Sequence, residues 1–328
     1  MRFAHLFRPS ASAIIFFLLL VAPPFFSSFL LTLVTQALIY AVLAMSLDII
    51  LGYTGLASLG HAAYFGLGAY SVGILATRYG SGFGITLPAG VVLAVTLAAI
   101  FGLVALRATG VYFLMITLAL GMVVWGLAHR WVTMTQGDNG ISAIPRPDLG
   151  LPWSLSLSIP FYYFALAGFL IAFWILRMIV RSPFGQTLIG IRESESRMET
   201  LGYHVWLHKY IGFIIAGGFG GFAGVLWAYY NVFVSPVDLQ LATSVEVLLM
   251  VALGGRSSLT GPALGAGIIV LLKNLVSVYT HRWLLILGAV YIHTIVYAPE
   301  GILGAVKRWT KERKPRTMSV PGLVKEET

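Results

Sequence analysis

The chain alternates between long apolar segments and short polar connections. Uninterrupted apolar segments lie at residues 28–51, 85–106, 111–128, 159–176 and 210–230. Segments that are shorter, or interrupted by Gly, Pro or a charge, lie at 11–22, 61–77, 239–253, 262–279 and 283–298. A helix needs about 20 mostly apolar residues to cross a bilayer. The pattern therefore predicts an all-α polytopic membrane protein with a bundle of about eight to ten transmembrane helices, some of them short or broken by glycine.

The composition supports this class and excludes several others. Of the 328 residues, 58% are hydrophobic and 10% are charged, against roughly 25% charged in an ordinary soluble domain. A soluble protein could not hide so much apolar surface, so a soluble enzyme, a disordered chain and a disulfide scaffold are excluded. Cysteine is absent, which removes thiolate chemistry and cysteine-ligated metal sites.

The basic residues are distributed unevenly over the predicted connections. With the N-terminus inside, most of the 21 Lys and Arg residues fall on the inner side, and the outer side holds Arg78, Arg130, Arg146, Lys273 and Arg282. This asymmetry predicts that both termini are cytoplasmic, with a transmembrane domain at residues 1–308 and a basic cytoplasmic tail at 309–328. A basic face against anionic membrane lipid also explains the net charge of +9 without nucleic-acid binding.

One connection predicted on the inner face, residues 181–206, is long and amphipathic. Ser182 and Pro183 are typical of a helix start, as the N-cap and first-turn residues. Apolar residues then recur on one helical face, at Phe184, Leu188, Ile191, Met198 and Leu201. Gly202 suits the position just after a helix end. The pattern predicts one amphipathic helix, or two short ones, between two spans.

The residues of this segment leave two interpretations open. A helix that rests on the membrane surface favours Lys and Arg and contains few acids. Here three acids accompany two arginines, namely Glu193, Glu195 and Glu199 with Arg192 and Arg197. The acids favour docking to a protein partner over a membrane-surface helix.

Two motifs resemble the permease subunits of the ABC importers for branched-chain amino acids. The pattern S-P-F-G-x-x-L-x-x-I-R-E-x-E-x-x-x-E-x-L-G, which begins at Ser182, is similar to the ATPase-contacting loop of that family. The stretch DIILGYTGLASLGHAAYFGLGAY, from Asp48 to Tyr70, resembles the signature of its LivM-type subunits. Further matches are RATGVYF, TQGDNG and VLLMVALGGRSSLTGPALG, so the resemblance covers most of the chain.

The resemblance implies a transport permease with no enzyme activity of its own. It implies that residues 181–206, the coupling segment, contact the ATPase through Pro183, Phe184, Gly185, Leu188, Ile191, Arg192, Glu193, Glu195 and Glu199. It also implies leucine, isoleucine and valine as substrates, a second homologous permease, separate ABC ATPase subunits, a periplasmic substrate-binding protein and the bacterial inner membrane as location. Family members that handle urea, short amides or other amino acids leave the substrate open.

Acids inside apolar segments and a glycine-rich break mark candidates for the substrate path. A charge at the centre of a membrane helix costs about 2.5–3.5 kcal/mol, and both Asp48 and Glu246 lie within apolar segments. Several glycines follow Asp48, and broken helices in transporters offer backbone groups to polar ligands. The predicted path residues are Asp48, Tyr53, Thr54, Ser58, His61 and Glu246. Internal hydrogen bonds or tight packing would explain the same residues without a path.

A faint internal repeat pairs residues 48–73 with residues 246–269. In both, an acid-bearing apolar segment is followed by Leu-Gly and then by Ser-Leu. Paired breaks in two halves of a transporter place a path at their interface. Glycines in G-x-x-x-G spacing at 217/221, 220/224 and 261/265 predict close helix packing, either within the chain or with a partner permease.

Two other segments allow a limited interpretation. Residues 11–22 resemble the apolar core of a signal peptide, but no small-x-small cleavage site follows them, so we predict a retained first helix. The polar residues 136–147 are predicted on the outer face, where they form either a contact for a binding protein or an ordinary loop.

The sequence contains no motif for a cofactor, a metal or catalysis. It has neither H-E-x-x-H, nor a Walker A motif, nor the G-x-S-x-G of hydrolases. We therefore predict no cofactor and no metal, with ATP hydrolysis supplied by a partner. The alternatives are an intramembrane enzyme and an ion-coupled secondary transporter in which Asp48 and Glu246 carry the coupling. The coupling segment favours the ABC permease, because a secondary transporter needs no ATPase dock.

Overall fold

The computed structural model describes residues 23–148 and 157–279, with isolated positions at 20, 155 and between 285 and 304. The longer helices are α2 (Ser28–Asp48), α3 (His61–Tyr79), α4 (Phe83–Ala105), α5 (Gly110–Arg130), α7 (Ser158–Arg181), α10 (Val205–Asn231), α11 (Leu241–Gly254) and α12 (Thr260–Tyr279). The short elements are η1 (Pro23–Phe25), the π-helix η2 (Ile49–Thr54), α6 (Val132–Thr135), η3 (Gly137–Asn139), α8 (Pro183–Glu193), α9 (Glu195–Thr200) and η4 (Pro236–Leu239).

The described part of the chain confirms the all-α polytopic prediction. Six of its helices are long and apolar enough to cross a membrane: α2 with η2, α4, α5, α7, α10 and α12. Helices α3 and α11 occupy two further predicted segments. The sheet in the described residues consists of the two-residue strands β1 (Ile141–Ser142) and β2 (Phe233–Val234), paired antiparallel with Ile141 opposite Val234.

Some predicted segments lie outside the described residues. These are the apolar segment 11–22, most of 283–298 and the basic tail 309–328. The division of the chain at residue 308 and the cytoplasmic position of both termini therefore stay predictions.

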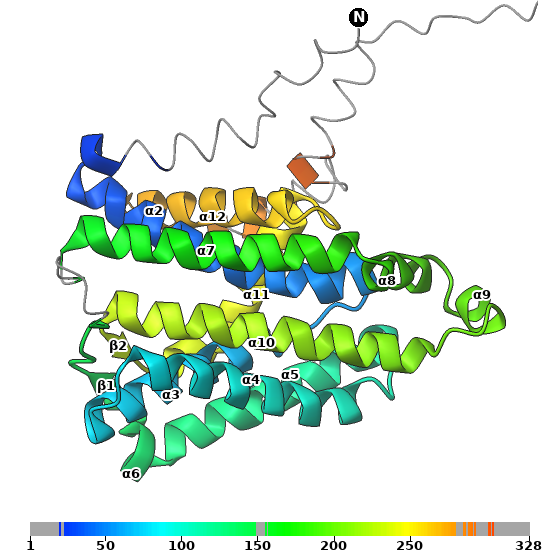
Figure 1. The fold of residues 1–328 in the computed structure, drawn as a ribbon, viewed down its shortest axis with the longest axis horizontal. Coiled ribbons are helices and arrows are strands. Elements are labelled where there is room, and N and C mark those ends of the chain that lie inside the picture. The colour runs from blue at the N-terminus through cyan, green and yellow to red at the C-terminus, as the bar shows by residue number, and fades with distance from the viewer. Residues whose placement is uncertain are drawn as a thin grey trace, which may run out of the picture.

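The long helices run side by side, with α10 across the middle of the bundle and α2 passing behind α7 (Figure 1). Helix α10 packs mainly against α3 and α4, and α2 packs mainly against α12 and α7. In the most apolar windows of α2 and α10, 72% of residues are buried, against 28% in α4 and 22% in α5. Helices α4 and α5 therefore leave most of their apolar surface outside the packed core, as expected of helices that face lipid.

Glycines in α10 let two neighbouring helices approach it closely. A Cβ added to Gly221 would collide with the Cβ of Ala94 on α4, and one added to Gly224 would collide with the carbonyl oxygen of Phe65 on α3. The overlapping G-x-x-x-G pairs of α10 therefore serve packing within the chain, where small residues allow backbones to meet.

Replacing Gly224 with leucine is expected to destabilise the folded chain by about 3 kcal/mol or more, because the new side chain must displace the backbone of α3. The measurement is the thermal unfolding temperature of the purified protein in detergent. Gly126→Leu is the matched control, because no atom lies within 4 Å of a Cβ built at that glycine of α5. Equal unfolding temperatures for the two variants would contradict the close packing of α10 on α3.

Candidate coupling site and transport path

The first feature of the site is a break between α2 and α3. Helix α2 continues as the π-helix η2, which ends at Gly55 with a φ of +79°, and regular structure resumes only at His61. The backbone between them is satisfied by protein groups, as membrane depth requires. The Leu59 amide donates to Thr117 Oγ1 of α5 at 3.2 Å, and the Ala62 amide donates to Ser244 Oγ of α11 at 3.0 Å. The predicted interruption of the helix is confirmed.

His61 joins the two sides of this break. The imidazole is 0% exposed, and its Nε2 lies 2.7 Å from Ser46 Oγ on α2. Because the Ser46 hydroxyl already donates to the Leu43 carbonyl at 2.7 Å, His61 must donate from Nε2 and leave Nδ1 as the acceptor. The hydrogen bond between His61 and Ser46 therefore links α3 to α2.

The second feature is a matching break between α11 and α12. Helix α11 ends at Gly254 and α12 begins at Thr260, and in between Gly255 has a φ of 110° and Ser257 a φ of 59°. The acid of this half, Glu246 on α11, accepts from Lys273 Nζ on α12 at 2.9 and 3.1 Å. The carboxylate is 5% exposed, so the ion pair with Lys273 offsets the penalty of placing it at membrane depth.

The two breaks are in direct contact. Asp48 Oδ1, at the end of α2, accepts from the Ser257 amide at 2.9 Å, and the Ser257 hydroxyl donates to the Gly52 carbonyl at 2.8 Å. A Cβ at Gly52 would collide with Asp48 Oδ1, so only glycine fits there. Both segments of the predicted internal repeat have the order helix, break, helix, and the repeat itself stays a prediction.

The coupling segment forms two short helices rather than one. The break falls at Ser194, whose hydroxyl oxygen accepts from the Arg197 amide at 3.3 Å and so caps α9. Gly202 has a φ of +87°, which agrees with the predicted helix end. Ser182 does precede the first helical residue of α8, but its hydroxyl donates back to the Ile179 carbonyl at 2.6 Å instead of capping α8. The segment therefore forms two short helices. Gly202 follows the second helix as predicted, whereas the side chain of Ser182 does not cap the first.

The apolar face of α8 packs on the core of the bundle. Leu188 and Ile191 are each 1% exposed, and Phe184 stacks on His208 of α10 with ring centroids 5.9 Å apart. Gly185 is buried and packs so closely on the end of α7 that a Cβ there would collide with the carbonyl of Val180. These four predicted coupling residues attach α8 to the transmembrane helices.

The polar residues of the coupling segment divide into two groups. Arg192 is exposed, but its guanidinium reaches the bundle, where Nη1 donates to the Gly52 carbonyl at 2.6 Å and to the Ser257 hydroxyl. Glu195 forms an ion pair with Lys209 of α10. The remaining predicted coupling residues, Pro183, Glu193 and Glu199, are exposed. Arg192 and Glu195 are exposed as well, so five of the nine predicted residues lie at the surface.

The sequence interpretation missed Lys209 and Ser257. The predicted apolar segment begins at residue 210, yet α10 begins at Val205 and includes Lys209, which is 6% exposed. Glu195 neutralises the buried ammonium of Lys209. A Glu near a Lys on the next predicted helix was a usable signal for this pair, whereas no local pattern marks Ser257 as the link between the breaks.

The predicted path residues are all buried in this conformation. Tyr53 and Thr54 are each 4% exposed and Ser58 is 0% exposed. The hydroxyl of Thr54 donates to the Ile50 carbonyl at 2.6 Å, and the amide of Gly60 donates to Ser58 Oγ at 3.3 Å. The structure brings Tyr53, Thr54 and Ser58 together with Asp48 around the first break, and it places Glu246 with Lys273. A path beside these residues would have to open by movement of the broken helices.

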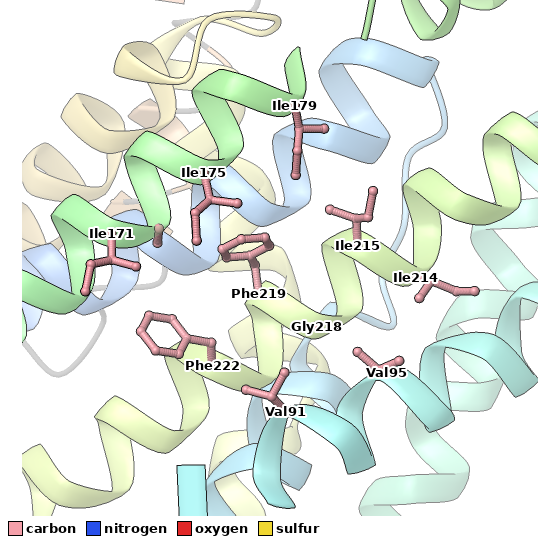
Figure 2. A pocket seen from close by; sticks show the side chains of 11 residues that line it. Val91, Val95, Ile171, Ile175, Ile179, Ile214, Ile215, Gly218, Phe219 and Phe222 are labelled. Carbon is pink, nitrogen blue, oxygen red and sulfur yellow. The ribbon is translucent and has the colours of Figure 1, made fainter. Parts of the chain in front are cut away.

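An apolar cavity of about 320 Å³ lies between α4, α7 and α10. Figure 2 shows side chains from all three helices converging on it, among them Val91, Val95, Ile175, Ile179, Phe219 and Phe222. Each of its lining residues is apolar or glycine. The cavity offers no side-chain partner for the ammonium and carboxylate of an amino acid, so it is no candidate for the transport path.

Broken helices that meet inside an apolar bundle define the class of this molecule as a multi-pass membrane transport protein. The chain belongs to the family described as "Branched-chain amino acid transport system / permease component", which it matches over residues 29–295. No solved structure matches the chain significantly.

Three curated relatives carry the name of one subunit. The chain is 31% identical to the high-affinity branched-chain amino acid transport system permease protein LivM of Escherichia coli, over 82% of this chain and 68% of the relative. The identity and coverage are the same for LivM of Salmonella typhimurium. The probable branched-chain amino acid transport permease protein LivM of Methanocaldococcus jannaschii is 24% identical, over 87% of this chain and 96% of the relative.

Proposed function

We propose that this chain is the membrane permease subunit of an ABC importer for branched-chain amino acids. The observation that carries the proposal is the coupling segment, whose α8 and α9 project from one end of the bundle beyond α7 and α10 (Figure 1). One side of this segment packs on the core, and the other leaves Glu193 and Glu199 exposed. Family membership and the names of the relatives support the transport role and the substrate class.

The energy for transport comes from separate subunits. The sequence has no Walker A motif with which to hold the phosphates of ATP. ATPase subunits docked on the exposed side of α8 and α9 would supply it. The complete importer would also contain a second, homologous permease and a periplasmic substrate-binding protein at the end of the bundle opposite to α8, in a bacterial inner membrane.

The mechanism is alternating access. Closure of the ATPase subunits on ATP pushes the coupling segment. Because Leu188 and Ile191 are buried in the core, α8 cannot move without displacing the helices around the two breaks. The buried residues at the first break, together with Glu246 in the second half, then line an open path. This chain performs no covalent chemistry.

The direct test is uptake of radiolabelled leucine by proteoliposomes that contain the chain, a second permease, the ATPase subunits and the binding protein. We expect uptake that requires ATP on the side of the membrane where the ATPase subunits lie. Uptake should cease when these subunits are omitted. Uptake that follows a proton or sodium gradient without any ATPase would overturn the proposal in favour of a secondary transporter. ATP-dependent uptake of urea or short amides, but not of leucine, would correct the substrate alone.

A further inference from the structure

The guanidinium of Arg192 touches both helix breaks at once. Arg192 lies in the last turn of α8, and its Nη1 donates to the Gly52 carbonyl at 2.6 Å and to the hydroxyl oxygen of Ser257. Gly52 lies in η2, which leads into the first break, and Ser257 lies in the break after α11. A single side chain of the coupling segment therefore bonds to both halves of the membrane domain.

The contacts around Arg192 form a closed set. The Ser257 hydroxyl donates its one proton to the Gly52 carbonyl at 2.8 Å, which leaves its lone pairs to accept from Arg192. The Ser257 amide donates to Asp48 Oδ1 at 2.9 Å. We call these four residues, Asp48, Gly52, Arg192 and Ser257, the junction. Each hydrogen bond in it joins groups that belong to different elements or to opposite sides of a break.

The backbone groups at the junction need partners from outside their own helices. The carbonyl of Gly52 lies in the last turn of η2, where helix carbonyls have no partner further along the helix. The amide of Ser257 lies in an unwound stretch with a φ of 59°. Buried backbone groups of this kind need a hydrogen-bond partner. Ser257 and Asp48 supply these partners from within the two halves, and Arg192 adds a second donor to the Gly52 carbonyl from α8.

The chain leaves room for Arg192 to reach the junction. Gly55 has a φ of +79°, and a Cβ at this position would lie 2.9 Å from Arg192 Cγ. The stem of Arg192 therefore passes directly over the backbone of the first break. The neighbouring residue Ile191 is 1% exposed, which fixes the end of α8 against the core. Any shift of α8 must move the guanidinium relative to Gly52 and Ser257.

We propose that Arg192 is a positioning residue that transmits the movement of α8 to both helix breaks, by holding the Gly52 carbonyl and the Ser257 hydroxyl together. The inference rests on the proposed function and adds to it the residue that connects the coupling segment to the transport path. Hydrogen bonds weaken steeply with distance and angle. A small displacement of α8 therefore breaks the bonds of Arg192 to Gly52 and Ser257 and lets the two helix breaks move apart. Arg192 acts through the junction.

The test measures both ATP hydrolysis and leucine uptake by the reconstituted importer, and compares the uptake obtained for each ATP. For Arg192→Gln we expect hydrolysis to stay within about twofold of wild type while uptake per ATP falls about tenfold or more, because the charge-assisted hydrogen bonds to Gly52 and Ser257 are lost. Arg192→Lys is expected to recover part of the uptake per ATP, because an ammonium can donate to the Gly52 carbonyl but lacks the planar fork of arginine. A residue needed only for folding would reduce both activities through the amount of assembled complex.

Arg256→Gln is the matched control. Arg256 precedes Ser257 and is exposed, and its charge, like that of Arg192, acts on Asp48. Its replacement removes the same charge from the same region, and we expect uptake per ATP to stay at the wild-type value. A loss equal to that of Arg192→Gln would overturn the inference, since charge alone would then explain the effect.

A second variant keeps the inference testable if Arg192→Gln does not assemble. Ser257→Ala removes the shared hydroxyl without touching α8, and it is expected to lower uptake per ATP as well. Where both assemble, the double variant is expected to lose little more than Arg192→Gln alone, because residues that act in one network are not additive. Additive losses would overturn the role of Arg192 and leave the proposed function standing. The same conclusion would follow if the wild type is active and the single variants keep its uptake per ATP. An inactive wild-type complex would overturn both.

Discussion

Reversing the charge of Glu193 and Glu199 together is expected to abolish ATP-dependent leucine uptake while leaving the permease folded in the membrane. Both carboxylates are exposed, and Glu193 ends α8 whereas Glu199 lies in α9. If they face complementary charges on an ATPase, Glu193→Lys with Glu199→Lys places like charges across the contact. Such contacts cost several kcal/mol, so uptake should fall about 100-fold or more.

The structure sets the choice of residues for this experiment. Sequence alone makes Glu195 as good a candidate as Glu193, but Glu195 forms an ion pair with Lys209. Its replacement by lysine would place two ammonium groups together at the start of α10 and disturb the fold. The neutral variants Glu193→Gln and Glu199→Gln are the graded controls, with an intermediate loss expected. Co-purification of the ATPase should fall in the same order. Uptake that persists with both charges reversed would show that the ATPase docks elsewhere.

Replacing Glu246 with glutamine is expected to destabilise the membrane domain by about 3–5 kcal/mol, because it leaves the Lys273 ammonium at membrane depth lacking the carboxylate it binds. Lys273 Nζ lies 2.9 Å from Glu246 Oε1, and the carboxylate side chain is 6% exposed. Thermal unfolding in detergent measures the loss. The effect is large because both oxygens of Glu246 accept from the same ammonium.

The double variant Glu246→Leu with Lys273→Leu separates stability from transport. Removing both charges is expected to restore the unfolding temperature, since a buried ion pair replaced by apolar residues is often neutral or stabilising. We expect uptake to stay low, because the proposed path would lose its only charge pair between α11 and α12 in the described part of the chain. Full uptake in this stable variant would show that the pair serves packing alone.

Much of the fold follows from local patterns in the sequence. Segments of spanning length are recognisable because lipid selects continuous apolar surface whatever their neighbours are. The interruption near Gly52 and Gly60 is also visible, because glycine runs disfavour a continuous helix. The spacing of apolar residues and the acids predict the coupling segment. They allow either one helix or two short ones, and do not indicate the division at Ser194.

The tertiary structure decided which of the predicted residues face one another. Nothing in the order of residues places Ser257 beside Asp48, or brings the guanidinium of Arg192 to the Gly52 carbonyl. Nor does the sequence alone show that Lys209 lies within a helix. These facts depend on how whole helices pack, and packing depends on side-chain shapes far apart in the chain.

For this protein, the sequence by itself determined the membrane class, most of the spans, the two interrupted regions and the family. Each of these is set by short-range chemistry: apolar length, glycine content and a contiguous motif. Only the tertiary structure decided that the two interruptions meet and that Arg192 joins them, because those hydrogen bonds link residues far apart in sequence. A local pattern indicates that a backbone group lacks a hydrogen-bond partner in its own helix, but the packing of the bundle determines which residue supplies that partner.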